Sequence, residues 1–498
     1  MNHSPLVFLR SIRLSPPSSA DKTADADRLI AALKQEGFDR VVIPLDILRR
    51  LPGELRKNGF ELDLVLGVEG ETVSVIDISR KRLYGLALDI GSTNIECALF
   101  DLSTGDELLG WKIGNPQVPF GSDVLTRVQG SMMGRFDLLA GELLEGINRL
   151  IREVCSLNGI AYDEIVVVTV AGNTIMTHFF LGLDVNNIPL SPYIPVVSSA
   201  VFLRGAESGL MTNRNSVVYV FPNAGSYVGG DIISGIIAAG VAQEEAPVLF
   251  VDVGTNVEVT LGCRDWIMTG AGAAGPALEG GIAGIGKTAE PGTIYKVRID
   301  RSTGRLQTEV LAGTEPQGIC GSGLIDLVAA LYDSGQIDQA GRFTVAASGV
   351  VERDGVKAFT VYRSGEVELM LTEPEIRNFL ISKAAMFSFL HVFVRSVGLT
   401  FRDIKKIYIA GALGCGIDPE SAIRIGMLPD VPRERFIPLG NSSLAGAGMV
   451  LMNADLLAEV DRISRMVTYR EMNEDAELMN ILQGAMFIPH TDPELLKG

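Results

Sequence analysis

Apolar and polar positions repeat with helical and strand periods along most of the chain, which is typical of an α/β protein. Over residues 25–78, DADRLIAALKQEG has helical spacing and DRVVIPL fits a strand. LDILRRLPGELRKNG then fits a helical pair broken at Pro52 and Gly53, and ELDLVLGVEGETVSVIDI fits a hairpin. Residues 1–24 are rich in Ser and Pro and predict a loose lead-in. We therefore expect a small α/β module over residues 1–82 with a structural or docking role.

One strand–turn–strand pattern occurs twice. LALDIGSTNIECALFD covers residues 86–101, and LFVDVGTNVEVTLGCRD covers residues 249–265. In each copy an apolar strand ends in an aspartate, Asp89 or Asp252, and leads into Gly and small polar residues. The copies lie too far apart for a solenoid repeat. They predict two related domains, each supplying one edge of a shared site.

The remaining pattern divides the chain further. Strand and helix signals alternate through VVVTVAGNTIMTHFFLG and FPNAGSYVGGDIISGIIAAG, and Thr372-x-x-Glu375 forms a capping box that opens a long helix. We predict domains over residues 83–246 and 247–455, followed by a helical tail over residues 456–498.

Charge and hydropathy narrow the class of partner. The chain has 43 Lys and Arg against 60 Asp and Glu, a net charge of −17, and no basic run. This argues against nucleic acid or an anionic membrane as the main partner. The longest apolar stretches, such as residues 232–242, are too short to cross a bilayer, and the N-terminus lacks a secretory signal, so we expect a cytoplasmic protein.

The cysteines and histidines do not predict a metal site. The five cysteines show no close metal-ligand spacing and are expected to be small buried hydrophobes, although Cys320 and Cys415 in Gly-rich turns could reach a ligand or a dimer partner. His178 and His391 stand among apolar helical neighbours and are expected to be core residues.

The repeated turn suits a nucleoside triphosphate. Phosphate oxygens need backbone donors from a turn without bulk, which Gly, Ser, Thr and Asn provide. Asp89 and Asp252 can hold Mg²⁺ or its waters, because Mg²⁺ prefers hard oxygen ligands. We expect the two turns to grip the phosphates across a cleft whose closure follows the nucleotide state.

These motifs resemble those of ATPases of the acetate kinase, sugar kinase, heat-shock chaperone and actin class. The resemblance implies an α/β fold with two duplicated actin-like, ribonuclease H-like domains around a nucleotide cleft. It also implies contacts to phosphate, metal or adenosine, carried by the motif residues Asp89, Gly91, Ser92, Thr93, Asn94, Gly172, Asn173, Asp252, Gly254, Thr255, Asn256, Gly321, Gly323, Gly411, Ala412, Gly414 and Gly446, with Gly448 nearby.

A closer resemblance covers about residues 84–455. DVGTNVEV, AAGPALEGG, GICGSGLIDL, IAGALG and GNSSLAGAG together are similar to the reductive activators of corrinoid proteins, and LPGELR at residues 51–56 is similar to that family's middle domain. The resemblance implies an ATPase, with Mg²⁺, that drives an electron onto the cobalt of a corrinoid protein and restores Co(I). It also implies a homodimer.

The chain departs from that family at its N-terminus and near the cobalt. No cysteine precedes Cys97, where relatives carry a four-cysteine ferredoxin domain, so no iron–sulfur cluster is expected in this chain. A separate ferredoxin-like donor, another function, or a fragment of a longer protein would account for this. Ala271 and Gly272 stand where relatives have Ser before Ala-Ala-Gly-Pro, which puts direct cobalt contact in doubt. Val257 and Leu413 are milder packing changes.

Some single residues stay open between two roles. Asp231 either orients the attacking water or caps a helix, with capping favoured. Glu258, two residues past Asn256, is a candidate water- or metal-orienting group. Glu279 either faces a partner or is an exposed loop carboxylate. GGIAGIGKT at residues 280–288 fits a P-loop only by chance, since no apolar strand precedes it.

Two other functions remain compatible with the same scaffold. A small-molecule kinase would need an acceptor pocket and a base, for which Asp231 is the only candidate. A non-redox ATP-dependent switch or assembly factor would keep the moving domains and lose the electron transfer.

Overall fold

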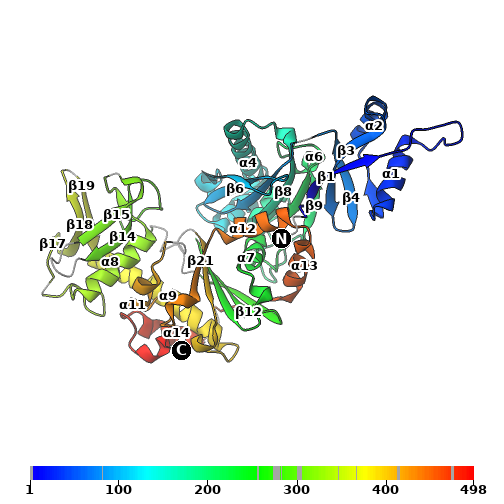
Figure 1. Ribbon diagram of the computed structural model, residues 1–498. Coiled ribbons are helices and arrows are strands. Elements are labelled where there is room, and N and C mark those ends of the chain that lie inside the picture. Colours follow the sequence, from blue (N-terminus) through cyan, green and yellow to red (C-terminus); the bar gives the residue numbers. More distant parts are fainter. Residues whose placement is uncertain are drawn as a thin grey trace. The chain divides into compact units, whose positions relative to one another are not determined.

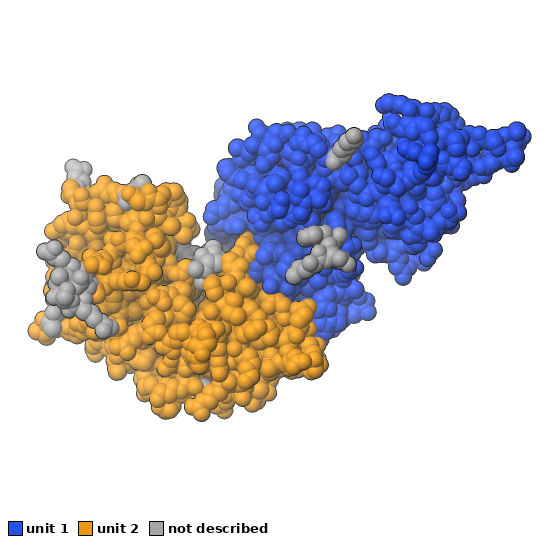
Figure 2. Space-filling model, in the orientation of Figure 1, with its two compact units in different colours: residues 1–238, 442–466 blue, residues 239–441, 467–498 orange. Residues whose placement is uncertain are grey.

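The computed structural model describes residues 4–80, 82–254, 257–272, 281, 283–299, 306–313, 315–345, 347–365, 367–411, 416–472 and 476–497. The chain forms two compact units, coloured separately in Figure 2. The first comprises Met1–Ala238 and Ser442–Met466, and the second comprises Ala239–Asn441 and Val467–Gly498. Residues 456–498, predicted as one helical tail, are thus shared between the units. The predicted domain boundaries stay predictions.

The N-terminal part of the first unit is a four-stranded sheet with two helices (Figure 1). The strand order is β1-β3-β4-β2, with β1 (Val7–Arg13), β2 (Arg40–Val42), β3 (Glu61–Glu69) and β4 (Thr72–Ile78). The helices are α1 (Asp25–Gln35) and α2 (Leu45–Lys57). Apolar residues of the helices and the sheet form one buried cluster, so the helices cover one face.

Two predictions for this module were wrong. β1 lies inside the segment predicted as a loose lead-in, because it pairs antiparallel with β3 along its whole length and buries Val7 and Ile12. α2 is one helix that continues through Pro52. Ile47, Leu51 and Leu55 lie four residues apart and are almost fully buried, and this packed stripe outweighs the lost backbone hydrogen bond.

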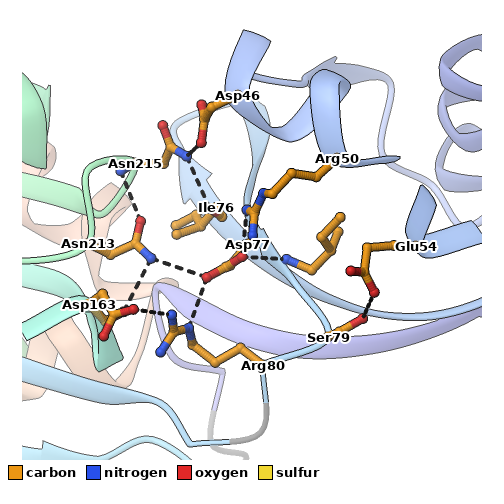
Figure 3. Close-up of polar contacts among 11 residues, drawn as sticks. Asp46, Arg50, Glu54, Ile76, Asp77, Ser79, Arg80, Asp163, Asn213 and Asn215 are labelled. Atoms are coloured by element: carbon orange, nitrogen blue, oxygen red, sulfur yellow. Dashed lines mark hydrogen bonds and ion pairs between the residues drawn. The ribbon is translucent and has the colours of Figure 1, made fainter. Parts of the chain in front are cut away.

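A polar network around the buried carboxylate of Asp77 joins the module to the rest of the first unit (Figure 3). Asp77, 4% exposed, accepts hydrogen bonds from Arg50 Nη2 at 2.8 Å and Arg80 Nε at 2.9 Å, and Arg80 also reaches Asp163. Asn213 Nδ2 donates to Asp77 at 3.3 Å. Burial by itself would raise the pKa of Asp77, but the hydrogen bonds from Arg80 and Arg50 lower it. The module is therefore held by charge as well as by packing.

The larger part of the first unit is built on a six-stranded sheet of order β7-β6-β5-β8-β10-β9. Its strands are β5 (Tyr84–Ile90), β6 (Asn94–Asp101), β7 (Glu107–Gly114), β8 (Ile165–Gly172), β9 (Val201–Arg204) and β10 (Val217–Val220). Its helices are α3 (Val124–Gly130), α4 (Phe136–Asn158), α5 (Thr174–Leu181), α6 (Gly205–Ser208), α7 (Gly230–Ala239), α12 (Ser442–Met452) and α13 (Leu456–Met466). Every residue of β8 is buried, as its continuous apolar run predicts.

The second unit has its own six-stranded sheet, of order β21-β20-β11-β12-β13-β22. The strands are β11 (Val248–Val253), β12 (Val257–Cys263), β13 (Trp266–Gly272), β20 (Ile407–Ala410), β21 (Phe436–Gly440) and β22 (Val467–Tyr469). Two small sheets follow the orders β15-β14-β16 and β17-β18-β19. Their strands are β14 (Thr293–Ile299), β15 (Leu306–Val310), β16 (Gly318–Ile319), β17 (Val350–Arg353), β18 (Val356–Ser364) and β19 (Val367–Thr372).

The described helices of this unit are α8 (Gly321–Asp333), α9 (Glu373–Arg395), α11 (Pro419–Arg424) and α14 (Ala476–Ala485). α9 begins as predicted, because Thr372 and Glu375 hydrogen-bond to each other's backbone N–H groups.

The two large sheets share one strand plan. β5 lies between β6 and β8 in the first, and β11 lies between β12 and β20 in the second. In both, the hairpin pairs antiparallel while the later strand pairs parallel. The predicted α/β fold with a duplicated hairpin is confirmed.

Candidate functional site

The first acidic turn lies at the end of β5. Asp89 is half-buried, and its strand partners are Glu96 on β6 and Ala171 on β8. Residues directly opposite each other on antiparallel strands carry their side chains on the same face. The hairpin therefore sets two carboxylates side by side. Like charges in that arrangement are unfavourable for strand pairing, so the fold alone does not explain them.

The second acidic turn repeats this arrangement. Asp252 on β11 is opposite Glu258 on β12 and beside Ala410 on β20. Gly411 follows, with φ of +85°, and a Cβ there would lie 2.4 Å from the carbonyl oxygen of Val253 and 2.5 Å from Asp252 Oδ1. Only glycine allows the chain to pass so close to the carboxylate.

Hydrogen bonds from buried side chains and backbone fix the carbonyl oxygens of the first turn, residues 91–93. The carbonyl oxygen of Gly91 accepts from Asn115 Nδ2 at 2.8 Å, that of Ser92 from Arg127 Nη2, and that of Thr93 from the backbone N–H of Asn115 at 2.8 Å. Asn115 and Arg127 are 3% and 0% exposed, so these carbonyl oxygens are directed into the protein. The turn therefore does not present them to an anion.

The residues of this turn fit a phosphate and its cation. A Cβ on Gly91 would lie 2.6 Å from the carbonyl oxygen of Asn94, so the tight turn requires glycine. Small, half-buried Ser92 and Thr93 follow it. The adjacent carboxylates of Asp89 and Glu96 are hard oxygen donors of the type that Mg²⁺ prefers.

A helix distant in sequence contributes to the first turn. Ser443 in α12 donates through Oγ to Asp89 Oδ1 at 2.8 Å. Gly446, predicted to line an adenosine pocket, is buried against α7, where a Cβ would lie 1.9 Å from the carbonyl oxygen of Ser234. Close helix packing accounts for this glycine, and its adenosine contact stays a prediction. Gly448 likewise packs against Phe100.

Asn173, one of the predicted motif residues, lies at the start of α5. Asn173 is the N-cap residue, and its Oδ1 accepts from the backbone N–H of Met176 at 2.9 Å. Gly229 lies so close that a Cβ would be 2.4 Å from Asn173 Cα and 2.7 Å from Asp231 Oδ1. Asp231 lies in the first turn of α7, where its Oδ1 accepts from the backbone N–H of Ile232 at 2.8 Å, and both of its predicted roles stay predictions.

Some other predicted site residues lie at packing positions, and some lie outside the described residues. Gly321 and Gly323 are buried in α8, and a Cβ on Gly323 would lie 2.6 Å from the carbonyl oxygen of Ile294. Gly254 is described as part of the second turn. The residues singled out in the sequence that lie outside the described residues are Thr255, Asn256, Glu279, Ala412, Leu413, Gly414 and Cys415.

The cysteines and histidines that are described lie in the core. Cys97, Cys155, Cys263 and Cys320 are all buried free thiols. Desolvation raises the pKa of Cys97 to about 12 and that of Cys155 to about 11, which makes them poor nucleophiles. His178 and His391 are buried in α5 and α9, as predicted.

The described residues hold neither a cluster of metal-ligand side chains nor a membrane-spanning helix. They contain no group of three His, Cys, Asp or Glu side chains placed to bind a metal. No helix in the described ranges has the length and hydropathy that crossing a membrane requires.

The sequence interpretation missed several residues around the first turn. Glu96 could have been found, because DIGSTNIE repeats the order of DVGTNVE, in which Glu258 was singled out. Asn115, Gln117 and Arg127 carry no local motif. Ser443 stands in GNSSLAGAG, but its partner Asp89 is 354 positions away.

Comparisons with known proteins agree along the chain. Family profiles match residues 1–82 as the RACo linker region, residues 84–244 as the RACo middle region, and residues 246–498 as the C-terminal ASKHA domain of RACo. The corrinoid activation enzyme RamQ of Eubacterium limosum is 30% identical over 80% of this chain and 69% of its own length. A [Co(II) methylated amine-specific corrinoid protein] reductase of Methanosarcina barkeri is 24% identical over 78% of this chain and 73% of its own.

A solved structure of a reductive activator for corrinoid, iron–sulfur protein aligns with a TM-score of 0.91 at 34% identity. The alignment covers 99% of this chain and 81% of that one. The profile over residues 246–498 includes the second acidic turn, and the structural alignment extends over nearly the whole chain, including both large sheets. The chain belongs to the RACo family of corrinoid activators.

Proposed function

We propose that this protein is an ATP-dependent activator of a corrinoid protein, which it returns from Co(II) to Co(I) with an electron from a separate iron–sulfur donor. The observation that carries the proposal is the repeated carboxylate pair, Asp89 with Glu96 and Asp252 with Glu258, on the strand plan of the RACo family. The names of three relatives, all corrinoid activators or reductases, support the substrate class.

Each acidic turn has a defined part in the proposal. The residues after Asp89 bind phosphate oxygens, since the carbonyl oxygens of their turn are held inside the protein by Asn115 and Arg127. Asp89 and Asp252 each supply hard carboxylate oxygens suited to a cation that would neutralise phosphate charge when bound. Glu96 and Glu258 are placed to orient water through their carboxylate oxygens. Gly411 keeps the backbone beside Asp252 without steric conflict.

The electron balance defines what ATP must supply. One electron leaves a reduced iron–sulfur donor and enters Co(II), giving Co(I), while ATP and water become ADP and phosphate. An uphill gap of ~200 mV for one electron corresponds to a cost of about 4–5 kcal/mol, or three to four decades in the equilibrium constant. Binding energy that differs between nucleotide states can offset a cost of this size.

The test combines ATP hydrolysis with the spectrum of the corrinoid. The protein is mixed with Mg-ATP, a Co(II) corrinoid protein and a reduced ferredoxin, and the Co(II) and Co(I) absorption bands are followed with time. We expect Co(I) to form only with ATP, and ATP hydrolysis to rise when the Co(II) protein is added. The proposal would be contradicted if the rate of ATP hydrolysis did not change when the corrinoid protein was added and no Co(I) formed.

The same samples separate the alternative functions. Phosphorylation of a sugar or carboxylic acid in place of corrinoid reduction would support the kinase. A nucleotide-dependent complex without Co(I) would support the switch. A homodimer is part of the proposal, and sedimentation of the nucleotide-bound protein measures it.

A further inference from the structure

A buried guanidinium, that of Arg127, lies behind the first acidic turn. Arg127 in α3 is 0% exposed and is among the largest fully buried side chains of the described protein. Its Nε donates to the carbonyl oxygen of Gly121 at 2.9 Å, and its Nη1 donates to Gln117 Oε1 at 3.2 Å. Its Nη2 donates to the carbonyl oxygen of Ser92, inside the turn. The planar fork is therefore fixed in direction by three acceptors.

Gln117 and Asn115 hold the fork and the turn in one network. Gln117 is 0% exposed; its Nε2 donates to the carbonyl oxygen of Leu139 at 2.9 Å, and its backbone N–H donates to Asn115 Oδ1 at 2.9 Å. Asn115 in turn holds the carbonyl oxygens of Gly91 and Thr93. A network whose members all have partners is rigid, so the turn is fixed before any ligand binds.

No carboxylate accepts a hydrogen bond from Arg127 among the described residues, and Asp123, the N-cap of α3, attracts its charge only through space. The hydrogen-bond acceptors of Arg127 are two carbonyl oxygens and an amide oxygen, and Met176 Sδ lies 3.4 Å away. Desolvation lowers the pKa of Arg127 to about 10, so the group still carries its charge near neutral pH. A buried cation held only by neutral groups is unfavourable unless an anion lies close by. The turn that Arg127 supports is the proposed phosphate site.

We propose that Arg127 is a positioning residue for nucleotide phosphate: it turns the Ser92 carbonyl oxygen inward and supplies a positive field behind the turn that the bound phosphate completes. The inference rests on the proposed ATP binding. It adds a residue in the layer behind the turn, outside every motif of the sequence. It predicts that Arg127 discriminates phosphorylated ligands from adenosine, which a purely structural arginine would not do.

The experiment compares Arg127→Met and Arg127→Lys with the unchanged protein. Calorimetry gives the dissociation constants of Mg-ATP, Mg-ADP and adenosine. We expect Arg127→Met to weaken Mg-ATP about tenfold and adenosine by less than about twofold. Arg127→Lys keeps the positive charge but loses the planar guanidinium. Its affinity for Mg-ATP should therefore lie between that of Arg127→Met and that of the unchanged protein. Equal losses for ATP and adenosine, or no loss with an intact fold, would overturn the inference.

Arg28→Met is the matched control. Arg28 is also buried, at 8% exposed, but it is paired with Asp21 in the N-terminal module. Its loss should lower the melting temperature and leave the ratio of ATP to adenosine affinity unchanged. If Arg127→Met does not fold, the same ratio measured on Arg127→Lys decides the question. Failure of the unchanged protein to bind Mg-ATP would instead overturn the proposed function.

Discussion

The two acidic hairpins have the same strand partners but differently supported turns. Asp89 and Asp252 each face a glutamate across the hairpin and an alanine on the parallel strand. In the first unit, the chain after β7 supplies Asn115 and Gln117 to the turn. In the second, the chain after β13 reads AAGPALEG over residues 273–280, without an Asn, Gln or Arg. The two hairpins thus share a strand plan but are followed by segments of different composition.

Each unit also buries a cation that donates to carbonyl oxygens. Arg127 holds the first acidic turn. Lys383 in α9, 0% exposed, donates through Nζ to the carbonyl oxygens of Phe487 at 2.8 Å and Pro489 at 2.7 Å in the C-terminal segment. The same kind of interaction fixes the first acidic turn in one unit and a terminal segment in the other. Mutations can separate these two roles.

The largest effects are expected from the aspartates. Asp89→Asn and Asp252→Asn keep the side-chain shape and remove the charge, so each should lower kcat for ATP hydrolysis by about 100-fold or more. Asp101→Asn and Asp265→Asn are matched controls, because these residues end the two repeated segments at the opposite end of each hairpin. They should leave kcat unchanged. If either Asp89→Asn or Asp252→Asn stays within about threefold of the unchanged protein, the two turns are not equivalent.

Lys383→Met should affect stability and spare nucleotide binding. Removal of the amino group, which is neutral in the folded protein at pH 9, leaves buried carbonyl oxygens without a donor, at a cost of about 2–3 kcal/mol in the free energy of unfolding at that pH. Denaturant titration measures this loss. The dissociation constant of Mg-ATP should stay within about twofold. A loss of ATP affinity as large as that of Arg127→Met would show that the two buried cations do not have separate roles.

The same variant has a defined pH dependence. Desolvation lowers the pKa of Lys383 from 10.5 to about 7 in the folded protein. Between these values the unfolded chain binds more protons, so the stability contributed by Lys383 rises with pH above 7 and is lost as pH falls toward 7. The difference in the free energy of unfolding between the unchanged protein and Lys383→Met should increase by about 2 kcal/mol from pH 7 to pH 9. Lys406→Met, at a half-exposed ion pair with Glu244, should show no such widening.

The glutamates test whether the duplication extends to catalysis. Glu96→Gln and Glu258→Gln should each lower kcat by about tenfold with little change in the KM for ATP, because the amide cannot take a proton from water. A loss at Glu258 alone would assign water orientation to the second turn. A loss in both would support a shared role. Unchanged kcat in both variants would leave the carboxylate pairs without a catalytic part.

Local signals in the sequence predicted the elements that depend on neighbouring residues. The hairpins follow from apolar strands around Gly and small polar residues, and α9 follows from Thr372 and Glu375. Pro52 was misread, because a local helix breaker is outweighed by packing of the surrounding stripe. Arg127 and Ser443 were missed, because their roles come from contacts with Ser92 and Asp89 that only the fold creates.

The smallest effect separates two adjacent serines at the start of α12. Ser443 Oγ donates to Asp89 Oδ1, whereas Ser442 Oγ is buried without a hydrogen-bond partner in the described structure. Ser443→Ala should lower ATP affinity or kcat by about three- to tenfold, because a hydrogen bond that orients a charged carboxylate is lost. Ser442→Ala removes an unpaired hydroxyl from the same helix, and should be neutral or slightly stabilising. Steady-state kinetics and thermal unfolding of the two variants measure both effects. A loss confined to Ser443→Ala would show that the first aspartate depends on a helix for its orientation.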